Sequence, residues 1–168
     1  WILGVAGLMI LGSSTVLAGP KGPTLVAVAS ELNSDTNGAY FGEFDLLIEA
    51  VLAADEAVYN TLVGNGQHTV FAPTDTAFEN LLGELTIDDL PQDFLTEVLL
   101  YHVVKGRRFS EDVIASSRLR TLLGDFLLQD GGVLTDNLDL TAGIEFVDVE
   151  AANGVIHVID AVVLPYAP

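Results

Sequence analysis

The feature that most constrains the fold is a change in hydrophobic periodicity about halfway along the chain. In the first half, apolar residues recur at helical spacing and form one continuous face, made of Phe44, Leu47, Ile48, Val51 and Leu52. In the second half, short β-type runs alternate with Gly, Asp and Asn residues. Helices followed by a group of hairpins predict an α+β fold, in which helices pack on a largely antiparallel sheet system.

Further elements follow from capping and turn residues. Helices are predicted at Asp75–Leu82, at 94–100 and from Ser110, whose first turn carries acids that the helix dipole favours. Thr74 or Asp75 is expected to cap the first of these helices, because either side chain can accept from an unpaired amide of the first turn. Residues 33–38 (NSDTNG) are expected to form a loop. Strands are predicted from His68 to Phe71 and at 119–123, 126–129, 133–135, 138–140, 144–150 and 155–163.

The N-terminus has the pattern of a sorting signal. Residues 1–18 carry no charge and end in Val16-Leu17-Ala18, which predicts a secretory signal peptide cleaved after Ala18. An uncleaved membrane anchor is the alternative, although the apolar run of about 11 residues is shorter than the ~20 that a membrane span needs. Residues 19–23 are then a flexible leader and 24–166 a single domain. We expect a secreted protein, extracellular, periplasmic or at the cell surface, with no membrane span in its mature form.

Composition excludes several kinds of partner and site. Acids outnumber bases 24 to 6, and the formal charge of −18 argues against nucleic acid and anionic membranes as partners. The acidic surface fits either general solubility or a salty milieu that screens the repulsion. The chain has no cysteine, its three histidines lack metal-ligand spacing, and no nucleophile or phosphate-binding motif is present. We therefore expect no catalytic residue, metal or cofactor, and read the acidic pairs at 88–89 and 136–139 as solvated turns.

In the stretch NGVIHVID, residues 153–160, His157 and Asp160 resemble part of a catalytic or metal-binding site. Strand geometry excludes this, because His157 and Asp160 fall on opposite faces. Asn153 and Gly154 predict a two-residue hairpin loop, and that register places Glu150 opposite His157 as its expected partner. His157 and His102 are expected to be structural and hydrogen-bonded, and His68 to lie at a surface edge.

Three motifs, taken in order, resemble the fasciclin domain. They are HTVFAPTDTAF at 68–78, the Tyr101-His102 pair within LLYHVV, and NGVIHVIDAVVLP at 153–165. The resemblance implies a wedge-shaped β-sandwich surrounded by helices, and a non-catalytic extracellular role in adhesion or in binding a matrix protein, cell-surface protein or polysaccharide. With no Asn-x-Ser/Thr sequon, the chain is similar to prokaryotic single-domain members.

The resemblance also implies a candidate interaction surface. In animal members, an Asp-Ile pair and the Tyr-His motif are implicated in integrin binding; the matching positions here are Asp148-Val149 and Tyr101-His102. The integrin partner itself is not carried over. Two alternatives remain open: a secreted acid/base hydrolase, which needs His102 in an open cleft beside a carboxylate, and a small-molecule or lipid carrier, which needs a deep apolar pocket.

Overall fold

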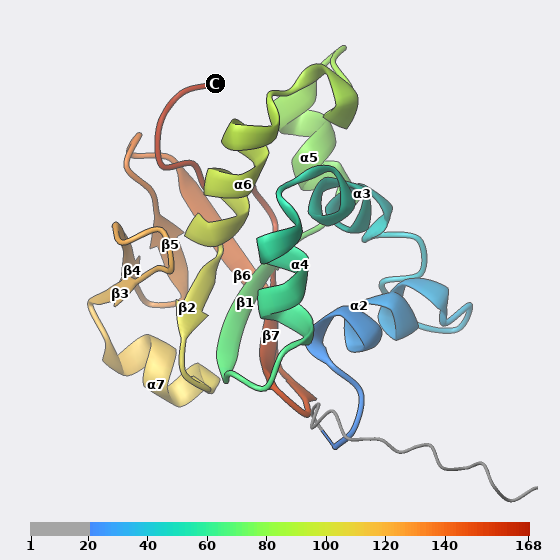
Figure 1. Ribbon diagram of the computed structural model, residues 1–168. Coiled ribbons are helices and arrows are strands. Elements are labelled where there is room, and N and C mark those ends of the chain that lie inside the picture. Colours follow the sequence, from blue (N-terminus) through green and yellow to red (C-terminus); the bar gives the residue numbers. More distant parts are fainter. Residues whose placement is uncertain (1–20) are drawn as a thin grey trace, which may run out of the picture.

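The computed structural model describes residues 21–168, and its fold is shown in Figure 1. The predicted signal peptide, and residues 19 and 20 of the predicted leader, lie outside the described residues. No helix within residues 21–168 is long and apolar enough to cross a membrane. The chain forms an α+β fold, as predicted, with most helices preceding most strands.

Helices dominate the first part of the chain. They are α2 (Leu25–Ser34), α3 (Asp45–Ala53), α4 (Glu56–Val63), α5 (Asp75–Leu82), the short 3-10 helix η2 (Ile87–Asp89), α6 (Gln92–Tyr101) and α7 (Ser110–Ala115). The Thr74 hydroxyl accepts from the Ala77 amide at 3.4 Å, which confirms the predicted N-cap of α5. Two details differ from prediction. Helix α2 continues through Ser34, into the loop predicted at 33–38, and the side chain of Leu52 is exposed rather than part of the buried helical face.

The strands form one mixed sheet of seven, in the order β2-β1-β7-β6-β5-β4-β3. Their bounds are β1 His68–Pro73, β2 Val103–Lys105, β3 Arg118–Arg120, β4 Phe126–Asp130, β5 Val133–Thr135, β6 Thr141–Ala151 and β7 Gly154–Ile159. The predicted antiparallel hairpins of the second half are confirmed, whereas β1 and β7 pair in parallel. A bridge between Val104 and Thr121 joins the two ends of the sheet, which therefore curls back on itself.

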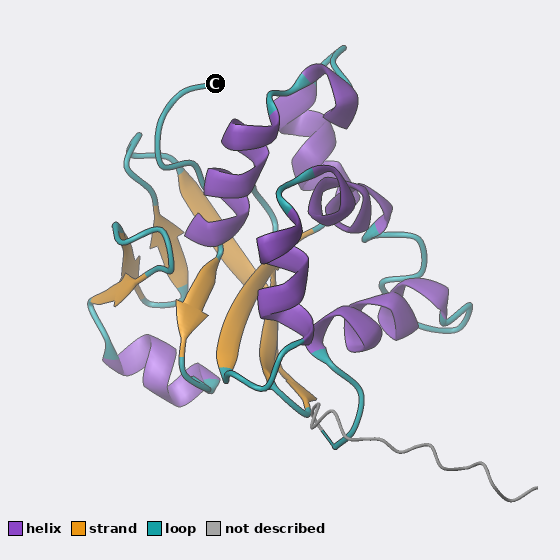
Figure 2. Ribbon diagram, in the orientation of Figure 1, coloured by secondary structure: helices purple, strands orange, loops and turns teal. Residues whose placement is uncertain are grey.

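The curled sheet separates two hydrophobic cores. One lies between the sheet and helices α2–α6, which gather on one side of the molecule in Figure 2. The other is lined by strands from both halves of the sheet and includes Phe71, Tyr101, Leu119, Leu127 and Ile159. Alternate residues of a strand point into the two different cores: Val70 packs against the helices, and Phe71 packs against the opposite strands. This arrangement corresponds to the predicted sandwich, with its layers continuous.

One predicted strand, at 138–140, is wrong. The carboxylate of Asp136 accepts hydrogen bonds from the amides of Leu138, Leu140 and Leu164 at 2.8–2.9 Å, so the segment folds into a turn around it. Asp139, with φ of 61°, completes this turn in the left-handed region. Asp136 is itself buried, which corrects the expectation that this acidic pair is solvated.

Candidate interaction site

The residues of the predicted interaction surface fall into two groups that the fold keeps apart. Tyr101 and His102 end α6 inside the molecule, and they are 0% and 2% exposed. The Tyr101 hydroxyl donates to the carbonyl of Phe126 at 2.9 Å, and burial raises the pKa of Tyr101 to about 12. The prediction that this pair forms part of an exposed surface is therefore wrong, because neither side chain reaches solvent.

His102 fastens the C-terminal segment to helix α6. Its Nδ1 lies 2.7 Å from the carbonyl of Val98, and its Nε2 lies 3.2 Å from the amide of Val163. Because Nε2 accepts from that amide, the ring is neutral and the proton sits on Nδ1. Burial lowers the pKa of His102 to about 4. Both nitrogens bond the backbone, so a hydrolase that uses His102 as its acid or base is ruled out.

The β6–β7 hairpin has a different register from the predicted one. Ala151 pairs with Gly154 and Glu150 with Val155, so the turn consists of Ala152 and Asn153. The predicted Glu150–His157 pair is therefore wrong; Glu150 instead forms an ion pair with Arg107 at 3.4 Å.

Asn153 explains the shift of register. Its buried side chain accepts from the amide of Leu25 at 2.8 Å and donates to the carbonyls of Leu62 and Gly64 at 2.7 and 2.9 Å. Gly154 lies so close to β1 that a Cβ there would clash with the carbonyl oxygen of His68. Both residues are thus structural, as expected, but through contacts that strand pairing alone does not indicate.

His157 is fully buried and stacks on Phe71, with ring centroids 5.6 Å apart. Its Nδ1 accepts from the Asp148 amide at 3.2 Å, and its Nε2 donates to the Arg108 carbonyl at 2.8 Å. The proton is therefore on Nε2, the opposite tautomer from His102. Burial lowers the pKa of His157, and the Arg108 hydrogen bond opposes that shift.

Asp148 lies at a bulge in β6. The register shifts between Phe146 and Val149, and Asp148 has a φ of 61°. Its carboxylate accepts from both the amide and the hydroxyl of Ser110 at 2.6 Å, which holds the start of α7 against β6. One consequence is that Glu145, Phe146 and Val147 are all exposed, although consecutive strand residues normally face opposite sides.

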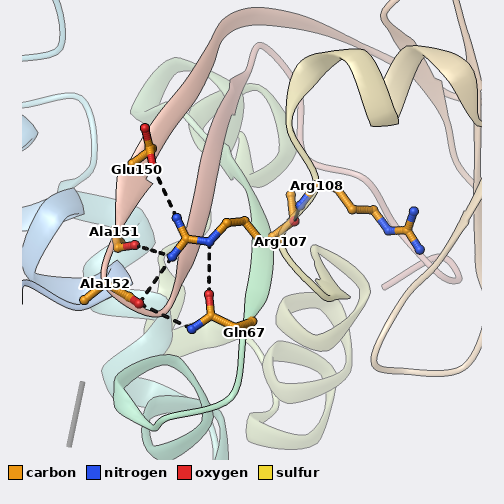
Figure 3. Close-up of polar contacts among 7 residues, drawn as sticks. Gln67, Arg107, Arg108, Glu150, Ala151 and Ala152 are labelled. Atoms are coloured by element: carbon orange, nitrogen blue, oxygen red, sulfur yellow. Dashed lines mark hydrogen bonds and ion pairs between the residues drawn. The ribbon is translucent and has the colours of Figure 1, made fainter. Parts of the chain in front are cut away.

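The loop before α7 is fastened to the same part of the sheet. The Thr69 hydroxyl donates to the Gly106 carbonyl and accepts from the Arg108 amide at 2.7 and 2.8 Å. Figure 3 shows the guanidinium of Arg107 reaching Glu150, the carbonyls of Ala151 and Ala152, and Gln67. Sequence reasoning missed Thr69 and Arg107, since no local motif links Thr69 to the loop 37–39 residues away, or Arg107 to the hairpin 44 residues away.

The described residues hold no cluster of metal ligands, and their apolar cleft is small. Within residues 21–168, no group of three or more His, Asp or Glu side chains could hold a metal ion. An apolar cleft between α2, α3 and β1 has a volume of about 60 Å³. Small-molecule sites usually measure about 300–1,000 Å³. The cleft is thus too narrow for the predicted alternative of a lipid or small-molecule carrier.

Known proteins share this architecture. A protein-family model of the fasciclin domain matches residues 42–165. Protein sll1483 of Synechocystis sp. is 41% identical over 128 residues, which cover 73% of this chain and 67% of that protein. The cell surface glycolipoprotein MPB83 of Mycobacterium bovis is 31% identical over 156 residues, which cover 88% of this chain and 67% of that protein.

A solved structure has the same fold. A FAS1 domain pair from the insect cell adhesion molecule fasciclin I superposes with a TM-score of 0.57 at 22% identity, covering 71% of this chain and 44% of that one. At this level of identity, the likeness extends to the fold and not to the residues of a binding site.

Proposed function

We propose that this chain, which belongs to the fasciclin domain family, is a secreted, non-catalytic interaction module that binds a cell-surface or matrix protein or polysaccharide through the bulge of β6. The observation that carries this proposal is the run Glu145-Phe146-Val147, three consecutive exposed residues. Phe146 and Val147 are 47% and 41% exposed. Adjacent exposed apolar side chains of this kind can supply the apolar anchor of an interface.

The bulge is also held rigidly, which suits a binding surface. Asp148 is fixed by the two hydrogen bonds from Ser110 and by its own amide, which donates to His157. On one flank, the ring of Tyr40 lies 5.7 Å from the ring of Phe146. A surface whose backbone is already ordered loses little conformational entropy on binding. Asp148 and Val149 therefore keep a place in the proposed surface, Asp148 chiefly by shaping it.

Relatives support an adhesive role for the family. The structural neighbour comes from a cell adhesion molecule, and a relative at 31% identity is a cell surface glycolipoprotein. The buried Tyr101 and His102 belong to the scaffold in this proposal, and they do not contact a partner.

The proposal can be tested by binding the purified protein to panels of cells, matrix proteins and glycans. The double variant Phe146→Ser/Val147→Ser should weaken binding at least about tenfold, since central apolar anchors contribute most of the energy of an interface. The matched control is Leu85→Ser/Ile114→Ser, which removes two exposed apolar side chains from other elements. Equal binding by the wild type and the bulge variant, with both folded, would show that the surface lies elsewhere.

A further inference from the structure

The positive charge of this acidic chain is concentrated in one short region. Five of the six Lys and Arg residues lie between positions 105 and 120, and the sixth is Lys21. Figure 3 shows that Arg107 and Arg108 point in opposite directions, with Arg107 turned to the β6–β7 hairpin. Arg107 is occupied there by its hydrogen bonds, whereas Lys105, Arg118 and Arg120 lie on strands β2 and β3.

Three of these cations share the outer face of the curled sheet. Arg118 and Arg120 are exposed and flank Leu119, which points into the inner core. The Val104–Thr121 bridge places the next residues, Lys105 and Arg120, beside each other. Because Val104 also points inward, Lys105 points outward. Lys105, Arg118 and Arg120 thus form a cationic strip, with neighbours about 5–7 Å apart by strand geometry.

The cationic strip forms no ion pair with the carboxylates of residues 21–168 of the protein itself. Acids outnumber bases four to one, yet the part of the chain that the structure describes contains a single ion pair, Arg107–Glu150. Lys105, Arg118 and Arg120 have no carboxylate oxygen within 4.0 Å. A chain so rich in carboxylates that leaves three adjacent cations unpaired has a surface available to an external anion.

Apolar side chains lie on the same face. On β4, Phe126 pairs with Arg120 and Leu128 pairs with Arg118. Both apolar residues are exposed, and the guanidinium of Arg118 lies 4.7 Å from the centre of the Phe126 ring. The strip therefore combines fixed positive charge with flat apolar surface, two features that suit the recognition of a charged sugar.

We infer that the cationic strip binds an anionic polysaccharide whose sugars carry carboxylates. This rests on the proposed function as an interaction module and names the chemistry of one partner. Three cations a few ångströms apart match a polymer with about one charge per sugar. The overall charge of −18 opposes every polyanion, and this opposition grows with the charge density of the polymer. Nucleic acid, with one charge per ~1.7 Å, is therefore opposed more strongly than a polymer with about one charge per sugar.

The test measures binding of the purified protein to immobilised alginate, a polymer with one carboxylate on each sugar, at about 20 mM and about 200 mM NaCl. The wild type should bind at low salt and lose affinity as salt rises. Arg118→Gln/Arg120→Gln should bind about tenfold more weakly, and Arg120→Gln about threefold more weakly. Lys21→Gln, which removes one exposed cation outside the strip, should bind like the wild type. Unchanged melting temperatures establish that the variants are folded.

Three results would overturn the inference: no alginate binding by the wild type at low salt, equal binding by the double variant, or tighter binding to single-stranded nucleic acid or anionic vesicles than to alginate. The bulge variant Phe146→Ser/Val147→Ser separates this inference from the proposed function. If it alone lowers binding, the bulge is the surface and the cationic strip is not. If the strip variant alone lowers binding, alginate binds the strip, and the role of the bulge is decided by the separate panels of cells, matrix proteins and glycans.

Discussion

Acidification is expected to destabilise this protein through one buried histidine, His102. The neutral ring accepts from the Val163 amide with Nε2 and donates to the Val98 carbonyl with Nδ1. Protonation places a second N–H against the Val163 amide, so a hydrogen bond becomes a repulsive contact between two donors. It also places a charge inside the core, where it is costly.

The magnitude follows from the pKa of the ring in the two states. In the unfolded chain the pKa of a histidine is about 6.5, and burial lowers the pKa of His102 to about 4 in the folded protein. The unfolded state then binds more protons between these values, so stability falls as the pH falls. Linkage gives a loss of about 2 kcal/mol at pH 5 and about 3 kcal/mol at pH 4, relative to pH 8. His157 contributes in the same direction, since its pKa is also lowered.

The assay is urea unfolding at a series of pH values for the wild type and for His102→Gln, a variant that cannot titrate there. The difference between the two stabilities isolates His102 from His157 and from the many carboxylates. It should shrink by about 3 kcal/mol between about pH 8 and about pH 4. NMR of the wild-type imidazole nitrogens provides a second measurement, because it reports the Nδ1–H tautomer directly. A difference that does not change with pH, or a ring that titrates near its ordinary pKa, would refute the reasoning.

Other predictions concern the residues that shape the candidate site. Asp148→Ala removes two charged hydrogen bonds to Ser110 and leaves a non-glycine residue at φ 61°; it should cost about 3 kcal/mol and speed amide exchange at the start of α7, whereas Asp148→Asn should cost less. Asn153→Ala removes the partners of two buried backbone groups and one part-buried one and should cost at least about 3 kcal/mol in urea unfolding, against about 1 kcal/mol or less for the largely exposed Asn137→Ala. At a formal charge of −18, the melting temperature should rise by several degrees up to about 1 M NaCl, and a flat response would contradict a role for charge repulsion.

Local patterns predicted the elements well and their long-range contacts poorly. The apolar face of α3, the cap at Thr74 and most of the short strands follow from spacing and capping within a few residues. The predicted hairpin register was wrong because the Asn153 side chain forms hydrogen bonds with Leu25, Leu62 and Gly64, which lie 89 residues away or more. The strand at 138–140 failed for a similar reason, since Asp136 also holds Leu164 from the end of the chain. In both cases a buried polar side chain that must be satisfied overrides a good local signal.

The same requirement explains why family resemblance indicates the scaffold better than the partner. His102, His157 and Asn153 all lie in the motifs that carry the resemblance, and each satisfies buried backbone groups from distant segments. Such residues cannot contact a ligand while they perform this role. The proposed bulge and the cationic strip lie outside the three motifs, on exposed positions of β3, β4 and β6 and at the end of β2. Substitutions in the motifs should therefore change stability first, whereas substitutions of the exposed Phe146 and Val147 and of the strip should change binding at constant stability.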